Sequence, residues 1–316
     1  MQLYIVRRLL TTVCTLLGVS IIVFVMIRLI PGTVVEQLLG QSALISDETL
    51  RSLREFFGLD RPWYLQYATW LGSFLKGDLG HSWRNDRPVL QLILSRFPVS
   101  AELALLSIAW SLLLGIPLGT LSALNRGKGV DNLIRLFSTL GLSIPAFWQG
   151  TLLIILFSIY LQWMPSLEWV GPLIDPWKNL SIMALPALTL GTATAAMITR
   201  MTRSAMLEAL SRDYIRTARA KGLRERRVIL YHALRNSLIP VITVAGVQMG
   251  YIIGGIVVVE DVFNLPGVGR LLLDAIFQRD YPVVQGTILV GAAVFMLLNF
   301  MVDVAYVIID PRIRYA

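Results

Sequence analysis

The chain has 316 residues, of which 55% are hydrophobic and only 15% charged, and its mean hydropathy is +0.67. Soluble domains carry more surface charge than this, so the composition predicts an integral membrane protein. The single cysteine, Cys14, excludes an intrachain disulfide or a thiolate metal cluster, and the distant His81 and His232 give no zinc spacing. The net charge is +8, but the basic residues lie where the topology of a membrane protein would place them, so we expect no nucleic-acid partner.

Six apolar segments are long enough to cross a hydrocarbon core of about 30 Å, which takes roughly 20 helical residues. They cover residues 9–30, 99–123, 134–160, 180–200, 236–259 and 284–309. The first is too long for a secretory signal and no cleavage site follows, so residues 1–30 are interpreted as a short tail and an uncleaved anchor helix. The expected fold is all-α and multi-pass, with a core of five helices in residues 99–316.

Lysine and arginine set the orientation of the helices. With the N-terminus inside, 17 of the 28 basic residues fall on the inner side, ten of them between Arg200 and Arg235. Both termini are therefore predicted to be cytoplasmic.

Two segments are expected on the outer side. Residues 31–98 are too long and polar for a simple connection, and the capping sequence Ser46-Asp47-Glu48 before Leu50, Leu53, Phe56 and Phe57 predicts an amphipathic helix in a small external subdomain. In residues 260–283, Pro266, Gly267 and Gly269 favour a turn, which predicts a short helix or loop across the mouth of the bundle.

Residues 201–234 form the only long charge-rich segment between two apolar ones. Helical spacing places Leu207, Leu210, Tyr214 and Ala218 on one face, and Arg212, Arg216 and Arg219 nearly opposite. Glu208 can pair with Arg212 four residues later, and Gly222 can end the helix. The pattern predicts a helix–glycine–helix elbow in the cytoplasm; the alternative is a basic loop resting on anionic lipid.

A family resemblance is carried by this segment. Arg216-Thr217-Ala218-x-x-x-Gly222 stands where ATP-binding-cassette importer permeases have the signature E-A-A-x-x-x-G, and DYIRTARAKGL resembles the dipeptide/oligopeptide/nickel permeases in particular. Here arginine replaces the glutamate, and Arg235 replaces a later proline. Further co-linear matches fall at residues 7–8, 29–32, 57–60, 77–80, 260–269, 279–282 and 310–315. The chain resembles the first of the two membrane subunits of such an importer.

The resemblance implies a type I importer permease with six transmembrane helices in a bacterial inner membrane. It would import peptides or a related small solute, such as glutathione or a nickel chelate. Its partners would be a second, similar permease, two cytoplasmic ATPase subunits that hold ATP and Mg, and an extracytoplasmic solute-binding protein. The chain itself would be no enzyme and bind no cofactor, and it has no phosphate-loop motif.

The resemblance also suggests functional residues. An elbow whose apolar side docks in a groove of the ATPase, with its arginines at an acidic rim, would pass motion to the flanking helices. The coupling residues would be Tyr214, Arg216, Thr217, Ala218, Arg219, Gly222 and Leu223. An external gate or binding-protein contact would comprise Glu260, Phe263, Pro266, Gly267, Arg279 and Asp280, unless this segment only connects two helices.

Inside the predicted spans, Gly246, Gly250 and Gly254 share one helix face, near Gln248. Small residues at this spacing allow close helix packing, and the same face can line the solute pathway at another depth. Glu102 and Asp303 lie near span ends, where interface or structural roles are expected.

Two other classes of protein remain as alternatives. A secondary transporter would need ion-coupling groups at mid-membrane, which the helix centres lack, and a membrane scaffold would need no gated path. Under any of these interpretations Pro145 and Pro186 interrupt the third and fourth spans, either as hinges or as kinks for packing.

Overall fold

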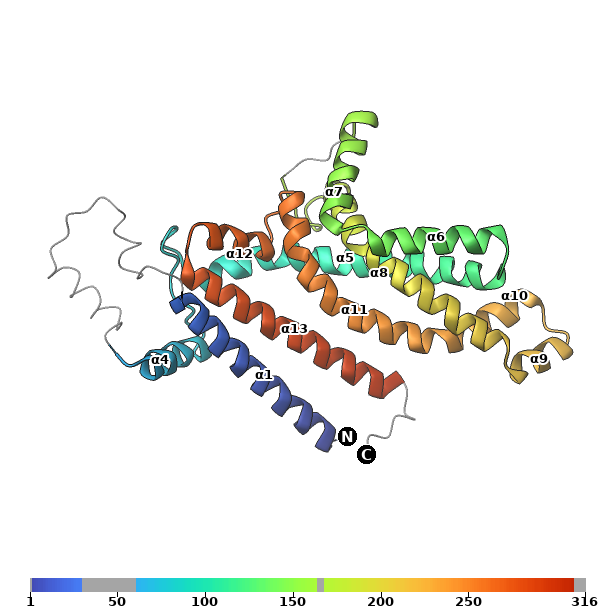
Figure 1. The fold of residues 1–316 in the computed structure, drawn as a ribbon, viewed down its shortest axis with the longest axis horizontal. Helices are drawn as coiled ribbons and strands as arrows, with labels where there is room; N and C mark the ends of the chain where they lie inside the picture. Colours follow the sequence, from blue (N-terminus) through green and yellow to red (C-terminus); the bar gives the residue numbers. More distant parts are fainter. Residues whose placement is uncertain (1, 30–60, 164–167, 310–316) are drawn as a thin grey trace. The chain divides into compact units, whose positions relative to one another are not determined.

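The computed structural model describes residues 2–29, 61–163 and 168–309, and the regular elements within them are helices (Figure 1). The chain divides into two compact units: residues 1–96 with 271–296, and residues 97–270 with 297–316. The capped helix predicted around residues 46–57 lies outside the described residues.

Five of the six predicted spans are single helices or helical runs. They are α1 (Gln2–Leu29), α5 (Val89–Leu124), α8 (Pro176–Leu210), the run that ends in α11 (Arg235–Val262), and α13 (Tyr281–Ile309). Each is long and apolar enough to cross a membrane. The prediction of an all-α, multi-pass protein is confirmed, and several helices extend well beyond the apolar segments that identified them.

The third predicted span, residues 134–160, is not one helix. It consists of α6 (Gly129–Ser143) and α7 (Ala146–Ile155) with the π-helix η1 (Leu156–Tyr160), and the two parts are bent by 107°. The cause is Pro145, which disfavours helical geometry in the residue before it, and Ile144 is accordingly extended at φ −84° and ψ 121°. Pro186, by contrast, is buried inside the continuous α8.

In the first unit, α4 (Trp63–Leu75) packs on α1. Phe24 of α1 contacts the rings of Tyr67 and Trp70, with centroids 5.3 and 5.6 Å away. Two polar contacts reinforce this packing: the hydroxyls of Ser20 and Tyr67 share a 2.7 Å hydrogen bond, and the Arg28 guanidinium donates to Gln66 Oε1 at 2.8 Å. Part of the segment predicted to be external is therefore a helix attached to α1.

In the second unit, close helix contacts occur at glycines. A Cβ atom on Gly119 of α5 would lie 2.5 Å from Thr202 Cβ of α8, and one on Gly141 of α6 would lie 3.3 Å from Ala196 Cβ of α8. Near the other end of this unit, Leu103, Met183 and Val259 form part of a buried apolar core between α5, α8 and α11. The helix α8 is thus the central element against which α5, α6 and α11 pack.

The glycine face of α11 is not uniform. A Cβ on Gly246 would lie 2.4 Å from Val302 Cγ1 of α13, so a close approach exists there, and Gly255 similarly faces Leu190 of α8. Gly254 is exposed with open space around it, and Gly250 and Gln248 are half-buried. The predicted close packing is present at Gly246, whereas Gly254 has no such neighbour within the described residues.

Gly246→Ala and Gly254→Ala form a matched pair, because both gain the helix propensity of alanine, up to about 1 kcal/mol. The added methyl group clashes with Val302 only at position 246, and overpacking of this kind costs about 1–3 kcal/mol. Thermal unfolding in detergent, followed by tryptophan fluorescence, should show a lower Tm for Gly246→Ala and an equal or higher Tm for Gly254→Ala. Equal Tm values for both variants would contradict this packing.

Candidate functional site

The charge-rich segment 201–234 is only partly a loop. Its first ten residues belong to α8, which ends at Leu210, and its last seven form the π-helix η2 (Val228–Leu234), which runs directly into α11. Between them lie α9 (Asp213–Ala220) and the short α10 (Glu225–Arg227). We call residues 211–224 the elbow.

The single amphipathic face predicted from Leu207 to Ala218 is wrong. The chain turns at Ser211 and Arg212, whose backbone N–H groups bond to the carbonyls of Glu208 and Ala209, so the helical periodicity of α8 does not continue into α9. The buried residues of α9 are Ile215 and Ala218, whereas Tyr214 is 40% exposed. The apolar side of the elbow therefore has a different composition from the predicted one.

The buried side of α9 packs against its own chain. Ile215 and Ala218 belong to a cluster with residues of α5, α8 and η2, namely Ala123, Met206, Ala209, Val228 and Ala233. The expectation that the apolar side of the elbow docks on another subunit does not fit this arrangement, because that side is already covered. Instead, the packing joins α9 to both helices that flank it.

Gly222 ends α9 as predicted. It has φ +74°, a left-handed conformation in which a residue with a Cβ is strained. The Gly222 N–H donates to Arg219 O at 2.9 Å and the Leu223 N–H to Ala218 O at 3.4 Å, the pair of bonds of a Schellman motif. Leu223 packs against the apolar cluster, as the residue after such a glycine often does.

Ion pairs border the elbow. Arg219 makes two hydrogen bonds to Glu225, at 2.6 and 3.2 Å, across the Gly222 turn, and the carboxylate raises the pKa of the Arg219 guanidinium. The predicted pair between Glu208 and Arg212 is present. Arg216 lies 3.7 Å from Asp213, but both side chains are largely exposed, so this contact contributes little. Thr217 is also exposed.

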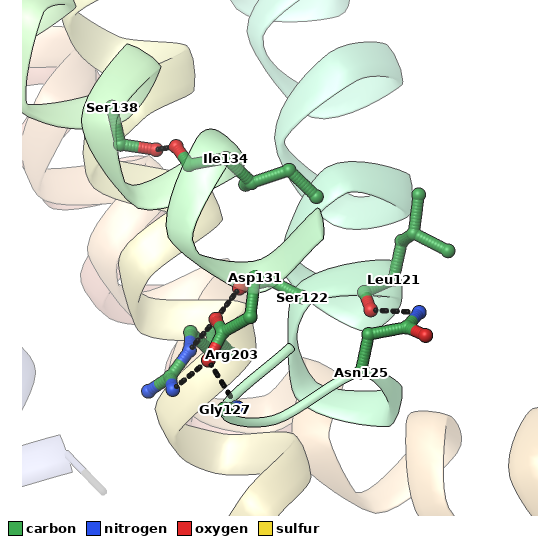
Figure 2. Close-up of polar contacts among 8 residues, drawn as sticks. All are labelled: Leu121, Ser122, Asn125, Gly127, Asp131, Ile134, Ser138 and Arg203. Carbon is green, nitrogen blue, oxygen red and sulfur yellow. Dashed lines mark hydrogen bonds and ion pairs between the residues drawn. The ribbon is translucent and has the colours of Figure 1, made fainter. Parts of the chain in front are cut away.

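A buried polar cluster lies near the same end of the second unit (Figure 2). The Asp131 carboxylate, 1% exposed, accepts hydrogen bonds from Ser122 Oγ of α5 at 2.6 Å and from the Gly127 N–H of the α5–α6 turn at 2.9 Å. Arg203 of α8 donates to both carboxylate oxygens at 2.8 Å. The cluster was not predicted from the sequence, in which its one local sign is an acidic residue that follows a basic turn.

Residues 260–283, which are predicted to lie on the outer side, contain a second buried carboxylate. Glu260 of α11 is fully buried, accepts a hydrogen bond from Ser100 Oγ, and accepts another from the Arg270 N–H in the first turn of α12 (Val268–Phe277) at 3.0 Å. Gly267 lies directly against this carboxylate, and Phe263, three residues after Glu260, is buried in the apolar core. All three residues are buried at the turn into α12, which does not favour direct contact with an external protein, so their assignment to an external gate or binding-protein contact stays a prediction.

Asp280 also faces inward. It is 3% exposed and accepts hydrogen bonds from Ser82 Oγ and the Trp83 N–H, which lie in the segment before α5. Of the six residues predicted for the external contact, Arg279 is exposed and Pro266 is half-buried. The predicted short helix in this segment is confirmed as α12.

One face of α11 is exposed in the second unit. Val247, Tyr251, Gly254 and Val258 repeat every three or four residues along it, and all four are exposed. This spacing makes a continuous strip along one side of the helix.

Among the described residues, no group of three His, Cys, Asp or Glu side chains could hold a metal ion.

Comparison with known proteins gives full-length matches. Residues 115–315 match the model of the binding-protein-dependent transport system inner membrane component, and residues 1–104 match the model of its N-terminal part. Glutathione transport system permease proteins GsiC of Escherichia coli, Salmonella paratyphi A and Shigella flexneri are each 42% identical over 312 residues, which is 99% of both chains. A crystal structure of an amino acid ABC transporter with histidines covers 71% of this chain and 94% of its own, with 13% identity and a TM-score of 0.49, too low to support an inference.

The buried position of the Asp131 cluster leads us to expect that it stabilises the folded protein. Asp131→Asn removes the charge that neutralises Arg203, whose side chain is only 23% exposed, and loss of one partner of a buried pair costs about 3 kcal/mol. Glu208→Gln is the matched control, because Glu208 is exposed and pairs with an exposed arginine, so its effect should stay within about 0.5 kcal/mol. Unfolding of both variants in detergent measures this difference, and equal stabilities would refute the role of Asp131.

Proposed function

Because the chain belongs to the family of binding-protein-dependent transport system inner membrane components, and is thus a permease subunit of an ABC importer, we propose that its elbow is the surface on which the ATPase subunits act. The chain is not an enzyme, since ATP is hydrolysed by separate subunits of such importers. The elbow is the described segment whose geometry best suits a mechanical link to them.

The observation that carries this proposal is the two-sided construction of α9. Its inner side, Ile215 and Ala218, is buried in the apolar cluster with α8 and η2. Its outer side, with Arg216 and Thr217, is exposed and has no strong partner among the described residues. The polar outer side, with Tyr214 at its edge, is therefore the docking surface, and the ATPase would meet it with acidic and hydrogen-bonding groups.

A displacement of α9 would move the helices to which it is anchored. The apolar cluster connects α9 to the end of α8 and to η2, and η2 continues into α11. Two turns before the end of α8, Arg203 is bonded to Asp131 of α6. Motion at the elbow would thus reach α6, α8 and α11 together, as expected of packed elements that shift between discrete arrangements.

The exposed strip of α11 is proposed to face the second permease subunit or the solute pathway between the two. Apolar residues and Gly254 along one helix side favour close contact with another helix. The half-buried Gly250 and Gln248 border this strip. On the outer side, Arg279 and Pro266 remain candidates for contact with the solute-binding protein.

For the solute, we propose a peptide or a related small molecule, and glutathione is the first candidate. Its support is the 42% identity, over 99% of both chains, to permeases named for glutathione transport. A nickel chelate is the second candidate, based on the family resemblance of the sequence. The protein would lie in a bacterial inner membrane with both termini in the cytoplasm, as the distribution of basic residues favours.

Gly222→Val tests the coupling role of the elbow. Valine at φ +74° costs about 1–2 kcal/mol in backbone strain, so the Schellman turn and the packing of Leu223 should be lost. We expect solute-stimulated ATPase activity and uptake to fall severalfold in proteoliposomes that contain the complete importer, while the amount of permease in the membrane stays the same.

Gly77→Val is the matched control. Gly77 ends α4 with φ +86° and the same pair of hydrogen bonds, from its own N–H to Phe74 O and from the Asp78 N–H to Ser73 O, and it too has open space around it. Its strain should be equal, but Gly77 belongs to the first unit and is not part of the apolar cluster that holds α9. Unchanged coupling in Gly222→Val, or an equal loss of stimulated ATPase activity in Gly77→Val, would contradict the proposal.

The solute is tested by uptake of radiolabelled glutathione in cells that carry or lack this chain. We expect uptake to require the chain and to be reduced by excess unlabelled glutathione, and a dipeptide to compete if the site accepts peptides more widely. Uptake that is equal with and without the chain would exclude glutathione, and competition by a nickel chelate alone would favour the second candidate.

A further inference from the structure

A partly open cavity of about 390 Å³ in the second unit is lined by three arginines, Arg135 of α6 and Arg200 and Arg203 of α8. The two helices run antiparallel, since Asp131 pairs with Arg203 at one end and Gly141 lies against Ala196 further along. Arg135 lies between these two contacts on α6, at the level of Arg200 on α8. The cavity therefore belongs to the α6–α8 seam, next to the Asp131 cluster.

The charge of this cavity is only partly neutralised. Arg203 donates two hydrogen bonds to Asp131, which balances one positive charge. Within the described part of the chain, neither Arg135 nor Arg200 forms an ion pair with a carboxylate, and both side chains are exposed. Three guanidinium groups thus share one carboxylate, and the two unneutralised ones face a space that can hold an anion.

The depth of the cavity indicates which anion. Arg200 is the last residue of the apolar segment 180–200, at the end that the distribution of basic residues predicts to be cytoplasmic, and Leu210, the end of α8, lies ten residues further, about 15 Å along the helix. The cavity is therefore at the level of lipid headgroups, and it lies nearer to the membrane interior than the elbow does. Met197, one turn before Arg200, and Leu142, two turns beyond Arg135, are exposed apolar residues on the side toward the membrane interior.

We propose that the cavity binds the phosphate group of an anionic phospholipid from the cytoplasmic leaflet. Arg135 and Arg200 contact the phosphate oxygens, since guanidinium groups match phosphate with paired hydrogen bonds, and the acyl chains lie along Met197 and Leu142. Basic cavities between membrane helices on the cytoplasmic side are suited to such headgroups. A soluble phosphate has the same chemistry but leaves the exposed apolar residues uncovered.

A bound lipid would hold α6 and α8 together beside Asp131 and Arg203. The exposed arginines would lose their mutual repulsion when the phosphate lies between them. This lipid site is independent of the proposal that the ATPase acts on the elbow, because its occupancy can be measured on the permease chain alone.

The test is lipid titration of the purified full-length chain in detergent, followed by native mass spectrometry. The probes are phosphatidylglycerol and phosphatidylcholine with the same acyl chains, and the variant is Arg135→Gln with Arg200→Gln, which leaves the Arg203 pair intact. Each basic residue near the surface changes affinity for anionic lipid roughly fivefold, so we expect the double variant to bind phosphatidylglycerol about 25-fold more weakly, with phosphatidylcholine unaffected.

The matched control is Arg224→Gln with Arg226→Gln, which removes the same charge from exposed positions outside the cavity. It should bind phosphatidylglycerol like the native chain. Melting temperatures without added lipid check that the cavity variant is folded, and a phosphatidylglycerol-induced rise in Tm that is lost only in the cavity variant supports the proposal as well.

Three results would overturn the proposal. One is equal phosphatidylglycerol affinity in the native chain and the cavity variant. Another is displacement of the lipid by millimolar inorganic phosphate alone, which would indicate a soluble anion site. The third is a photocrosslinker at the exposed Thr139, one turn after Arg135, that captures a polypeptide and no lipid in native membranes.

Discussion

The burial of Ile215 and Ala218 against α8 and η2 is the interaction on which the rest of the account depends. Apolar contacts of this kind exclude water and fix the short α9, which would be too short to persist by itself. Because the inner side of α9 is occupied, only its polar outer side can receive another subunit. The Schellman turn at Gly222 and the bidentate pair between Arg219 and Glu225 then fix where the chain leaves the helix and returns to the membrane. The elbow is thus a rigid extension of α8 and α11, which is what transmission of a displacement requires.

Much of this architecture could be predicted from the sequence, because it depends on local signals. Apolar length identified the membrane helices, and a glycine after a charged helix identified the turn at Gly222. The interruption of the third span at Pro145 was also predicted, since a proline restricts the residue before it, whereas the size of the bend, 107°, was not. The end of α8 was misplaced for a different reason: charged residues mark where the membrane ends, and a helix can continue beyond that point.

Contacts between distant residues could not be predicted in this way. Asp131 and Arg203 are 72 residues apart, and nothing in either local sequence reveals that they meet. Residues 260–283 are a second example of contacts that the local sequence does not reveal. Glu260, Gly267 and Asp280 stand in motifs shared with the importer permeases, and this resemblance predicted an external gate or binding-protein contact. In the structure, the carboxylates of Glu260 and Asp280 accept hydrogen bonds from Ser100 and Ser82, and Gly267 is buried against Glu260. A motif thus identifies a family well, while the burial of each residue decides whether it can touch a partner.

Thiol protection measures directly whether the ATPase binds the outer side of α9. Cys14 is the only cysteine of the chain, so after its replacement by serine an introduced cysteine is the sole thiol. The maleimide labelling rate is measured for Thr217→Cys, on the outer side of α9, and for Lys128→Cys, an exposed control in the α5–α6 turn, with and without the ATPase subunits. If the ATPase covers this side, assembly strongly slows labelling at position 217 and leaves labelling at position 128 unchanged. Labelling at position 217 that is equally fast in the assembled importer would contradict it.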